Sequence, residues 1–129
     1  MTITFKDETA TGKLLQELSV EVKAEVLTVK DIIIARVTAE VNAYNEKLPE
    51  YFNGLVQPTD AERVLNGYRL RERRQIDAEK QGYIALKAFQ ENGFFILIDN
   101  KQVDDLAEEI ALNRNSIVSF VKLTPLVGG

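Results

Sequence analysis

The sequence predicts an α+β fold, in which one mixed sheet is covered on one face by a helix. Apolar and polar residues alternate near the start of the chain, a helical spacing of apolar residues follows, and strand-like runs return near its end. The chain has 129 residues, 45% hydrophobic and 28% charged, as expected of a globular protein with one core. We therefore expect one domain over residues 1–129.

The first element is an amino-terminal hairpin. Ile3 and Phe5 alternate with polar neighbours, and a second alternating run extends from Leu18 to Val22. Residues 6–13 between them are polar and contain a glycine, which is typical of a loop that turns one strand back on the other.

A helix is expected to begin after Thr28. Thr28 and Asp31 form a pattern like a capping box, and Pro49 marks the end, because proline cannot continue a helix. Arg36 and Glu40 lie off the apolar stripe. The stripe itself comprises Val29, Ile33, Val37, Val41 and Tyr44.

Residues 48–93 are expected to form a helical insertion between this helix and the third strand. Thr59 and Glu62 resemble a second capping box and Asn66-Gly67 a helix stop, which favours a short helix. A longer helix, ending at Asn92-Gly93, is expected from the helical spacing of Ile76, Tyr83, Leu86 and Phe89.

Strands are expected again near the end of the chain. The apolar run from Phe94 to Ile98 is typical of a strand covered on both faces. A second run, Ile117 to Leu123, predicts the last strand, and the pattern ends after Thr124. The expected body is about 1–47 and 94–123, followed by a flexible tail at 124–129.

Composition excludes several classes of function. The chain has neither cysteine nor histidine, so thiolate, imidazole and zinc-thiolate chemistry are excluded, and we expect no metal site and no enzyme. A net charge of -4 argues against nucleic acid as a partner. No apolar run approaches the length of about 20 residues that a membrane helix needs, and the start has no leader pattern, so we expect a cytoplasmic protein and no membrane partner.

Two groups of residues are candidates for a partner surface. Val121 and Leu123 on the last strand are either core residues or part of an exposed apolar patch. The arginine-rich stretch predicts either a solvated surface or a contact with an acidic protein. Its members are Arg69, Arg71, Arg73 and Arg74.

The order of elements and three short motifs resemble the ubiquitin-like β-grasp family. The hairpin loop ends in Thr11-Gly12-Lys13, as the ubiquitin hairpin does, and Lys101-Gln102-Val103 is similar to the turn before its small hydrophobic segment, with Asn100 in place of a glycine. The ending Pro125-Leu126-Val127-Gly128-Gly129 resembles the sulfur carrier subunit of molybdopterin synthase. The similarity covers about 1–47 and 94–129, and the middle of the chain has no counterpart in either family.

The resemblance implies a function for the diglycine at Gly128 and Gly129. A separate activating enzyme would use ATP to adenylate the Gly129 carboxylate, and no cofactor would be tightly bound. Thr124, Pro125, Leu126 and Val127 would form the docking tail. The five residues from Pro125 to Gly129 span at most about 16 to 18 Å when extended, enough to reach into the active site of another protein. The expected function is a protein modifier, with conjugation targets or a deconjugating protease as further partners. A sulfur carrier with a terminal thiocarboxylate and an interaction module that is never activated are the alternatives.

Overall fold

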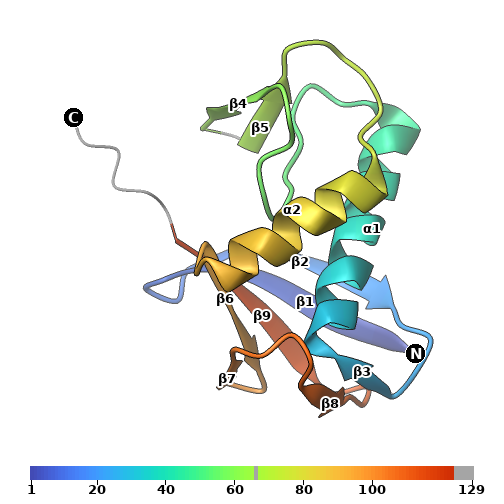
Figure 1. The fold of residues 1–129 in the computed structure, drawn as a ribbon, viewed down its shortest axis with the longest axis vertical. Helices are drawn as coiled ribbons and strands as arrows, with labels where there is room; N and C mark the ends of the chain where they lie inside the picture. Colours follow the sequence, from blue (N-terminus) through green and yellow to red (C-terminus); the bar gives the residue numbers. More distant parts are fainter. Residues whose placement is uncertain (66, 124–129) are drawn as a thin grey trace.

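The computed structural model describes residues 1–65 and 67–123. In these ranges the chain has the expected α+β fold: a mixed sheet of five strands carries two helices on one face (Figure 1). The elements are β1 (Thr2–Thr9), β2 (Leu14–Glu21), β3 (Val26–Thr28), α1 (Val29–Lys47), β4 (Ala61–Val64), β5 (Gly67–Leu70), α2 (Ala78–Gln90), β6 (Phe94–Ile98), β7 (Lys101–Val103), β8 (Glu109–Ala111) and β9 (Ile117–Lys122).

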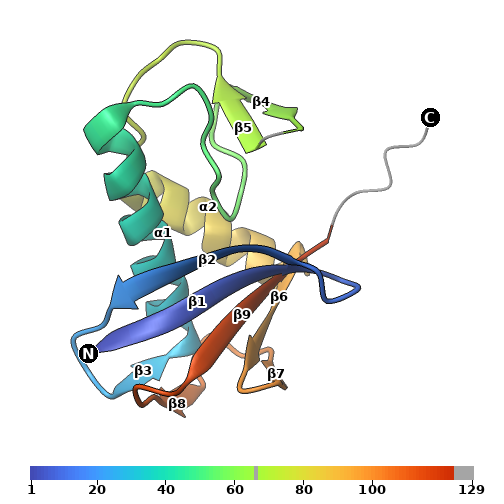
Figure 2. The same cartoon turned by 180° about the vertical axis from the view of Figure 1, so that it is seen from behind.

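The main sheet has the strand order β2-β1-β9-β6-β7. β1 and β2 form the expected antiparallel hairpin, and β1 pairs in parallel with β9. β6 then pairs antiparallel with β9, so the last strand lies at the centre of the sheet. Figure 2 shows the opposite face of the sheet, which the two helices do not cover.

The hairpin loop is shorter than expected. β1 continues to Thr9 and β2 begins at Leu14, so residues 6–9, which were expected in the loop, belong to a strand. The buried face of β1 therefore continues from Ile3 and Phe5 to Asp7, and all three side chains are fully buried. This extension places a carboxylate in the core.

The capping box of α1 is confirmed. The Thr28 hydroxyl accepts a hydrogen bond from the Asp31 N–H, and the Asp31 carboxylate accepts one from the Thr28 N–H. At the other end Leu48 adopts a left-handed conformation with φ of 45°, and its N–H donates to the Tyr44 carbonyl at 2.7 Å. All five residues of the predicted stripe are buried. Arg36, which was expected off the stripe, is also fully buried.

The prediction of a short helix after Thr59 is wrong. Residues 61–64 and 67–70 form the antiparallel hairpin β4–β5, in which Glu62 lies opposite Arg69. Ala61 is buried but Leu65 is fully exposed, so this segment lacks the continuous apolar stripe that would hold a helix against the body. The sequence pair Asn66-Gly67 is also a hairpin signal, which here prevails over its interpretation as a helix stop.

The longer helix is confirmed as α2. Asp77 caps it by accepting a hydrogen bond from the Lys80 N–H at 3.2 Å. Tyr83, which was expected in its apolar stripe, is 63% exposed, and the buried face contains Gln81 and Gly82 instead. A Cβ at Gly82 would lie 2.9 Å from Cδ1 of Ile34, so this glycine permits a close approach of α2 to α1.

β6 was expected to be covered on both faces, and this is wrong for one of them. Phe94, Ile96 and Ile98 are buried beneath the helices, whereas Phe95 and Leu97 are half-buried on the opposite face. The core of the body is thus one layer of side chains between sheet and helices, with aromatic contacts such as Phe5 to Phe120, whose ring centres are 5.5 Å apart.

Candidate functional site

The carboxyl end of β9 presents different chemistry on its two faces. Val118 and Phe120 are fully buried toward the helices, and Lys122 continues that face. Ile117 and Leu123 are 39% and 40% exposed. Because side chains alternate along a strand, these two residues and Val121 belong to the face that the helices leave uncovered.

An apolar patch surrounds Val121 on the uncovered face. Val121 lies directly opposite Phe95 in the antiparallel pair, and both side chains are half-buried. Leu97 on β6 and Ile117 on β9 extend it. We call these four residues the open-face patch. Contiguous exposed apolar side chains are typical of protein interaction sites, so the predicted partner residue Val121 has suitable neighbours.

On the helix-facing side, the same end of β9 lies against a buried charge network. Arg36 donates from Nη1 and Nη2 to the two carboxylate oxygens of Asp7, the second at 2.7 Å, and from Nε to Glu40 at 2.9 Å. Lys122 Nζ lies 3.7 Å from Asp7 Oδ2. The guanidinium carbon of Arg36 also lies 4.9 Å from the ring centre of Phe120. The two carboxylates of this network, Asp7 and Glu40, balance the charges of its two bases, Arg36 and Lys122.

Burial and pairing set the protonation of this network. Burial acts to raise the pKa of Asp7, but the hydrogen bonds and charge of Arg36, together with Lys122, hold that pKa below its usual value. Burial raises the pKa of Glu40 and outweighs Arg36 and the Leu55 N–H. Burial also lowers the pKa of Lys122, despite the nearby Asp7 carboxylate. Burial therefore disfavours the charged forms of Glu40 and Lys122, at the two ends of the network, whereas the Asp7 carboxylate between Arg36 and Lys122 is stabilised.

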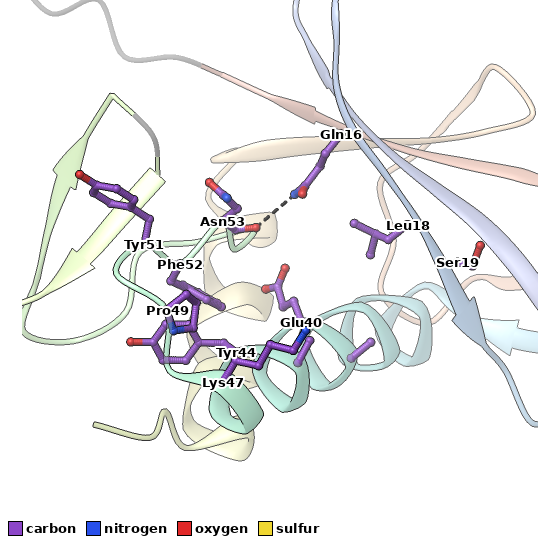
Figure 3. Close-up of a pocket in the computed structure, with 12 residues that line it drawn as sticks. Gln16, Leu18, Ser19, Glu40, Tyr44, Lys47, Pro49, Tyr51, Phe52 and Asn53 are labelled. Atoms are coloured by element: carbon purple, nitrogen blue, oxygen red, sulfur yellow. Dashed lines mark hydrogen bonds between the residues drawn. The ribbon is translucent and has the colours of Figure 1, made fainter. Parts of the chain in front are cut away.

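Three side chains of the body hold three consecutive residues of the middle of the chain. Gln16 from β2 donates to the Asn53 carbonyl at 3.1 Å, the interaction drawn in Figure 3. Lys122 from β9 donates to the Gly54 carbonyl at 2.8 Å, and the Glu40 carboxylate accepts from the Leu55 N–H at 3.1 Å. We call these three interactions the backbone clamp. It ties the charge network and the end of β9 to residues 53–55.

Two cavities share Gln16 and Asn53 as lining residues. The first, of about 370 Å³, lies between β2, α1 and residues 49–53, and Leu18, Tyr44 and Phe52 give it an apolar lining (Figure 3). The second, of about 480 Å³, lies between β2, the β4–β5 hairpin and the end of β9. We call the first the helix-side cavity and the second the hairpin-side cavity.

The four arginines lie apart from the open-face patch. Arg69 on β5 pairs with Glu62, and Arg74 donates to the Thr59 carbonyl at 3.0 Å. Arg71 and Arg73 are exposed in the segment after β5. Both overall views show the β4–β5 hairpin at the upper end of the molecule and β9 in the lower half (Figures 1 and 2). The arginine-rich stretch and the candidate partner residues on β9 therefore do not form one continuous surface.

The remaining predicted site residues lie outside the described part of the chain. These are Thr124, Pro125, Leu126, Val127, Gly128 and Gly129. Within 1–65 and 67–123, no group of three metal-ligating side chains was found, and neither helix in those ranges is long and apolar enough to cross a membrane.

The charge network was missed by the sequence reasoning, although two signals for it were present. Arg36 and Glu40 are four residues apart, a spacing that places them on one side of a helix. Asp7 continues the alternation of Ile3 and Phe5, which puts it on the buried face if the strand extends that far. Nothing in the local pattern connects either signal to Lys122.

Comparisons with protein-family models, with curated proteins and with solved structures found no match to this chain. A function must therefore be argued from the residues and their geometry.

Proposed function

We propose that this chain is a ubiquitin-like protein modifier with a β-grasp body, activated at the carboxylate of Gly129 by a separate ATP-dependent enzyme. The observation that supports it best is the parallel pairing of β1 with β9, beside a helix that crosses the sheet. In this arrangement β9 is anchored between two strands, and the diglycine follows it by a few residues in the sequence.

The chemistry requires a carboxylate that another protein can reach. A free carboxylate is a poor acyl donor, so the activating enzyme would join it to AMP and release pyrophosphate from ATP. An amine of a target would then attack the acyl carbon, lose a proton and displace AMP, which leaves an amide. Gly128 and Gly129 suit this step because they lack a Cβ and pass a narrow channel.

The open-face patch provides a place where such an enzyme would dock. Phe95 and Val121 lie opposite each other near the end of β9, on the face that the helices leave uncovered. A partner bound there would be near the start of the segment that carries the diglycine. Leu123, 40% exposed just after β9, would extend the contact toward that segment.

The test is an ATP-dependent reaction in a lysate of the source organism, followed by mass spectrometry. Trypsin would cut after Lys122, so a conjugated target lysine would retain a remnant of residues 123–129. We expect this remnant only with ATP and only with the full chain, and not with a variant that lacks Gly128 and Gly129. Failure to find it with a lysate that conjugates an added reference modifier would contradict the proposal.

Two variants test the docking role of the open-face patch. Val121→Asp should reduce conjugation by tenfold or more, because a carboxylate in an apolar interface would have to be desolvated. Tyr83→Asp is the matched control, since Tyr83 is 63% exposed on α2, and it should react as the unaltered chain does. Equal activity of both variants would remove the patch from the proposal.

The same sample distinguishes the alternatives. A mass gain equal to replacement of one oxygen by sulfur, with no remnant on any target, would mean a sulfur carrier. Retention of every specific partner after deletion of Gly128 and Gly129 would mean an interaction module that is not activated.

A further inference from the structure

The hairpin-side cavity differs from the helix-side cavity in its charge. Among the described residues that line it, Lys122 and Arg63 are cationic and Asp7 is the one acid. The helix-side cavity contains Glu40 and Lys47 in a mainly apolar lining. With about 480 Å³, the hairpin-side cavity falls within the size range of small-molecule sites, about 300 to 1,000 Å³.

Asp7 does not neutralise both cations of this cavity. Its Oδ2 atom accepts from Arg36 at 2.7 Å and from Gln16 at 2.6 Å, and its Oδ1 atom accepts from the other Arg36 nitrogen. Lys122 Nζ is 3.7 Å from Oδ2, which is beyond hydrogen-bond distance. The charge of Asp7 is therefore mainly matched by Arg36.

Lys122 and Arg63 both retain donor capacity. The Lys122 ammonium has three N–H groups, and its hydrogen bond to the Gly54 carbonyl uses one of them. Arg63, on β4, forms no ion pair or side-chain hydrogen bond with any residue in 1–65 or 67–123. Arg63 lies opposite Tyr68, whose pKa is raised by burial while the Arg63 charge acts against that rise. The cavity lining thus has a net positive charge and unused donors.

An apolar wall accompanies these donors. Leu15 on β2 is 50% exposed, and Leu65 in the turn after β4 is fully exposed. Val64 lies beside Leu65 and is half-buried. A ligand that places a charged group on Lys122 and Arg63 would cover these side chains with its remaining atoms, which removes apolar surface from water.

We propose that the hairpin-side cavity binds a carboxylate carried on a short branched aliphatic group, with the carboxylate at Lys122 and Arg63 and the aliphatic part against Leu15 and Leu65. A carboxylate suits these two side chains, because each of its two oxygens can accept a hydrogen bond from one of them. This proposal does not depend on the modifier function.

The test is a titration followed by amide chemical shifts of the full chain, with 4-methylpentanoate as the probe. We expect saturable shifts at Gly54, Gly67 and Tyr68. The neutral isostere 4-methylpentanamide should bind at least tenfold more weakly, because it offers no negative charge to the two cations. Equal affinity for acid and amide, or no saturable shift at these amides, would overturn the proposal.

Arg63→Gln is the variant of choice, because the exposed Arg63 side chain is not part of the charge network. It should weaken binding of the acid at least tenfold while the spectrum remains that of a folded chain. Arg71→Gln is the matched control, since Arg71 is exposed and does not line the cavity, and it should bind as the unaltered chain does. An Arg63→Gln variant that binds normally would overturn the assignment.

A second ligand distinguishes the possible sources of the carboxylate. An acetylated Leu-Glu dipeptide amide carries the same chemistry as an acidic side chain of a protein partner. Stronger binding of this peptide than of the free acid would indicate a protein source, and stronger binding of the free acid would indicate a metabolite. Either order supports a carboxylate site.

Discussion

The sheet with its two helices, which we call the body here, and the middle segment, residues 48–77, share one apolar core but differ in the polar contacts that hold them. The body buries apolar side chains between a five-stranded sheet and two helices. The middle segment also buries apolar side chains in that core, among them Phe52, Leu55 and Ile76. In addition, its backbone is held by side chains of the rest of the molecule through the backbone clamp. The comparison shows that a segment with little regular secondary structure can be fixed by a few buried side chains together with polar groups that the body supplies to its backbone.

The largest expected effect is in the body. Phe120→Ala removes a fully buried ring that contacts Phe5 and Phe94, with centres 5.5 and 6.3 Å away. We expect the free energy of unfolding to fall by about 3 to 5 kcal/mol. Urea denaturation followed by circular dichroism measures it. A loss below about 1 kcal/mol would mean that the core does not depend on this contact.

A smaller effect is expected from Gly54→Ala in the middle segment. A Cβ at Gly54 would overlap the ring of Phe52, which is buried against Tyr44. Displacing that ring should cost about 1 to 3 kcal/mol in urea denaturation. Adding Phe52→Leu, which shortens the side chain, should recover part of the loss. Further destabilisation by the second change would contradict this steric explanation.

Gln16→Ala tests the backbone clamp directly. It removes the hydrogen bonds to Asp7 and to the Asn53 carbonyl, which should cost about 1 kcal/mol. Amide hydrogen exchange at Leu55 and Phe52 should become faster, while amides within β9 retain their protection. Gln102→Ala, on exposed β7, is the control and should change neither. Equal acceleration in the middle segment and in β9 would show that the two regions unfold together.

The smallest effect is a pH dependence of stability caused by Glu40. Because burial raises its pKa in the folded chain, the folded state binds more protons than the unfolded state between the usual pKa of 4.5 and the raised value. The free energy of unfolding therefore falls as the pH rises through this window. Asp7, whose pKa is lowered, acts in the opposite direction, and its stabilisation is lost only as the pH falls below 3.8.

Glu40→Gln isolates the contribution of Glu40. As the pH rises from 4.5, the free energy of unfolding of the unaltered chain should fall relative to that of the variant. Urea denaturation of both proteins at several pH values measures this change. A difference that does not change with pH would contradict the raised pKa.

The elements of the body could be predicted because each is determined by local chemistry. The Thr28 capping box, the stripe from Val29 to Tyr44 and the runs at 94–98 and 117–123 depend on contacts within a few residues. A short helix was predicted where the structure has the hairpin β4–β5. Thr59 and Glu62 satisfy a helix pattern, whereas the cross-strand pair of Glu62 and Arg69 exists only in the folded chain.

The sequence by itself determined the fold class, the hairpin, the α1 and α2 helices and the absence of cysteine and histidine chemistry. Only the tertiary structure brought Asp7 of β1 and Lys122 of β9 to the Arg36–Glu40 pair of α1, because these three elements are far apart in the sequence. Periodicity reports which side of an element is buried, but not which other element packs against it. The charge network, the backbone clamp and the hairpin-side cavity all arise between elements, and so they were decided by packing.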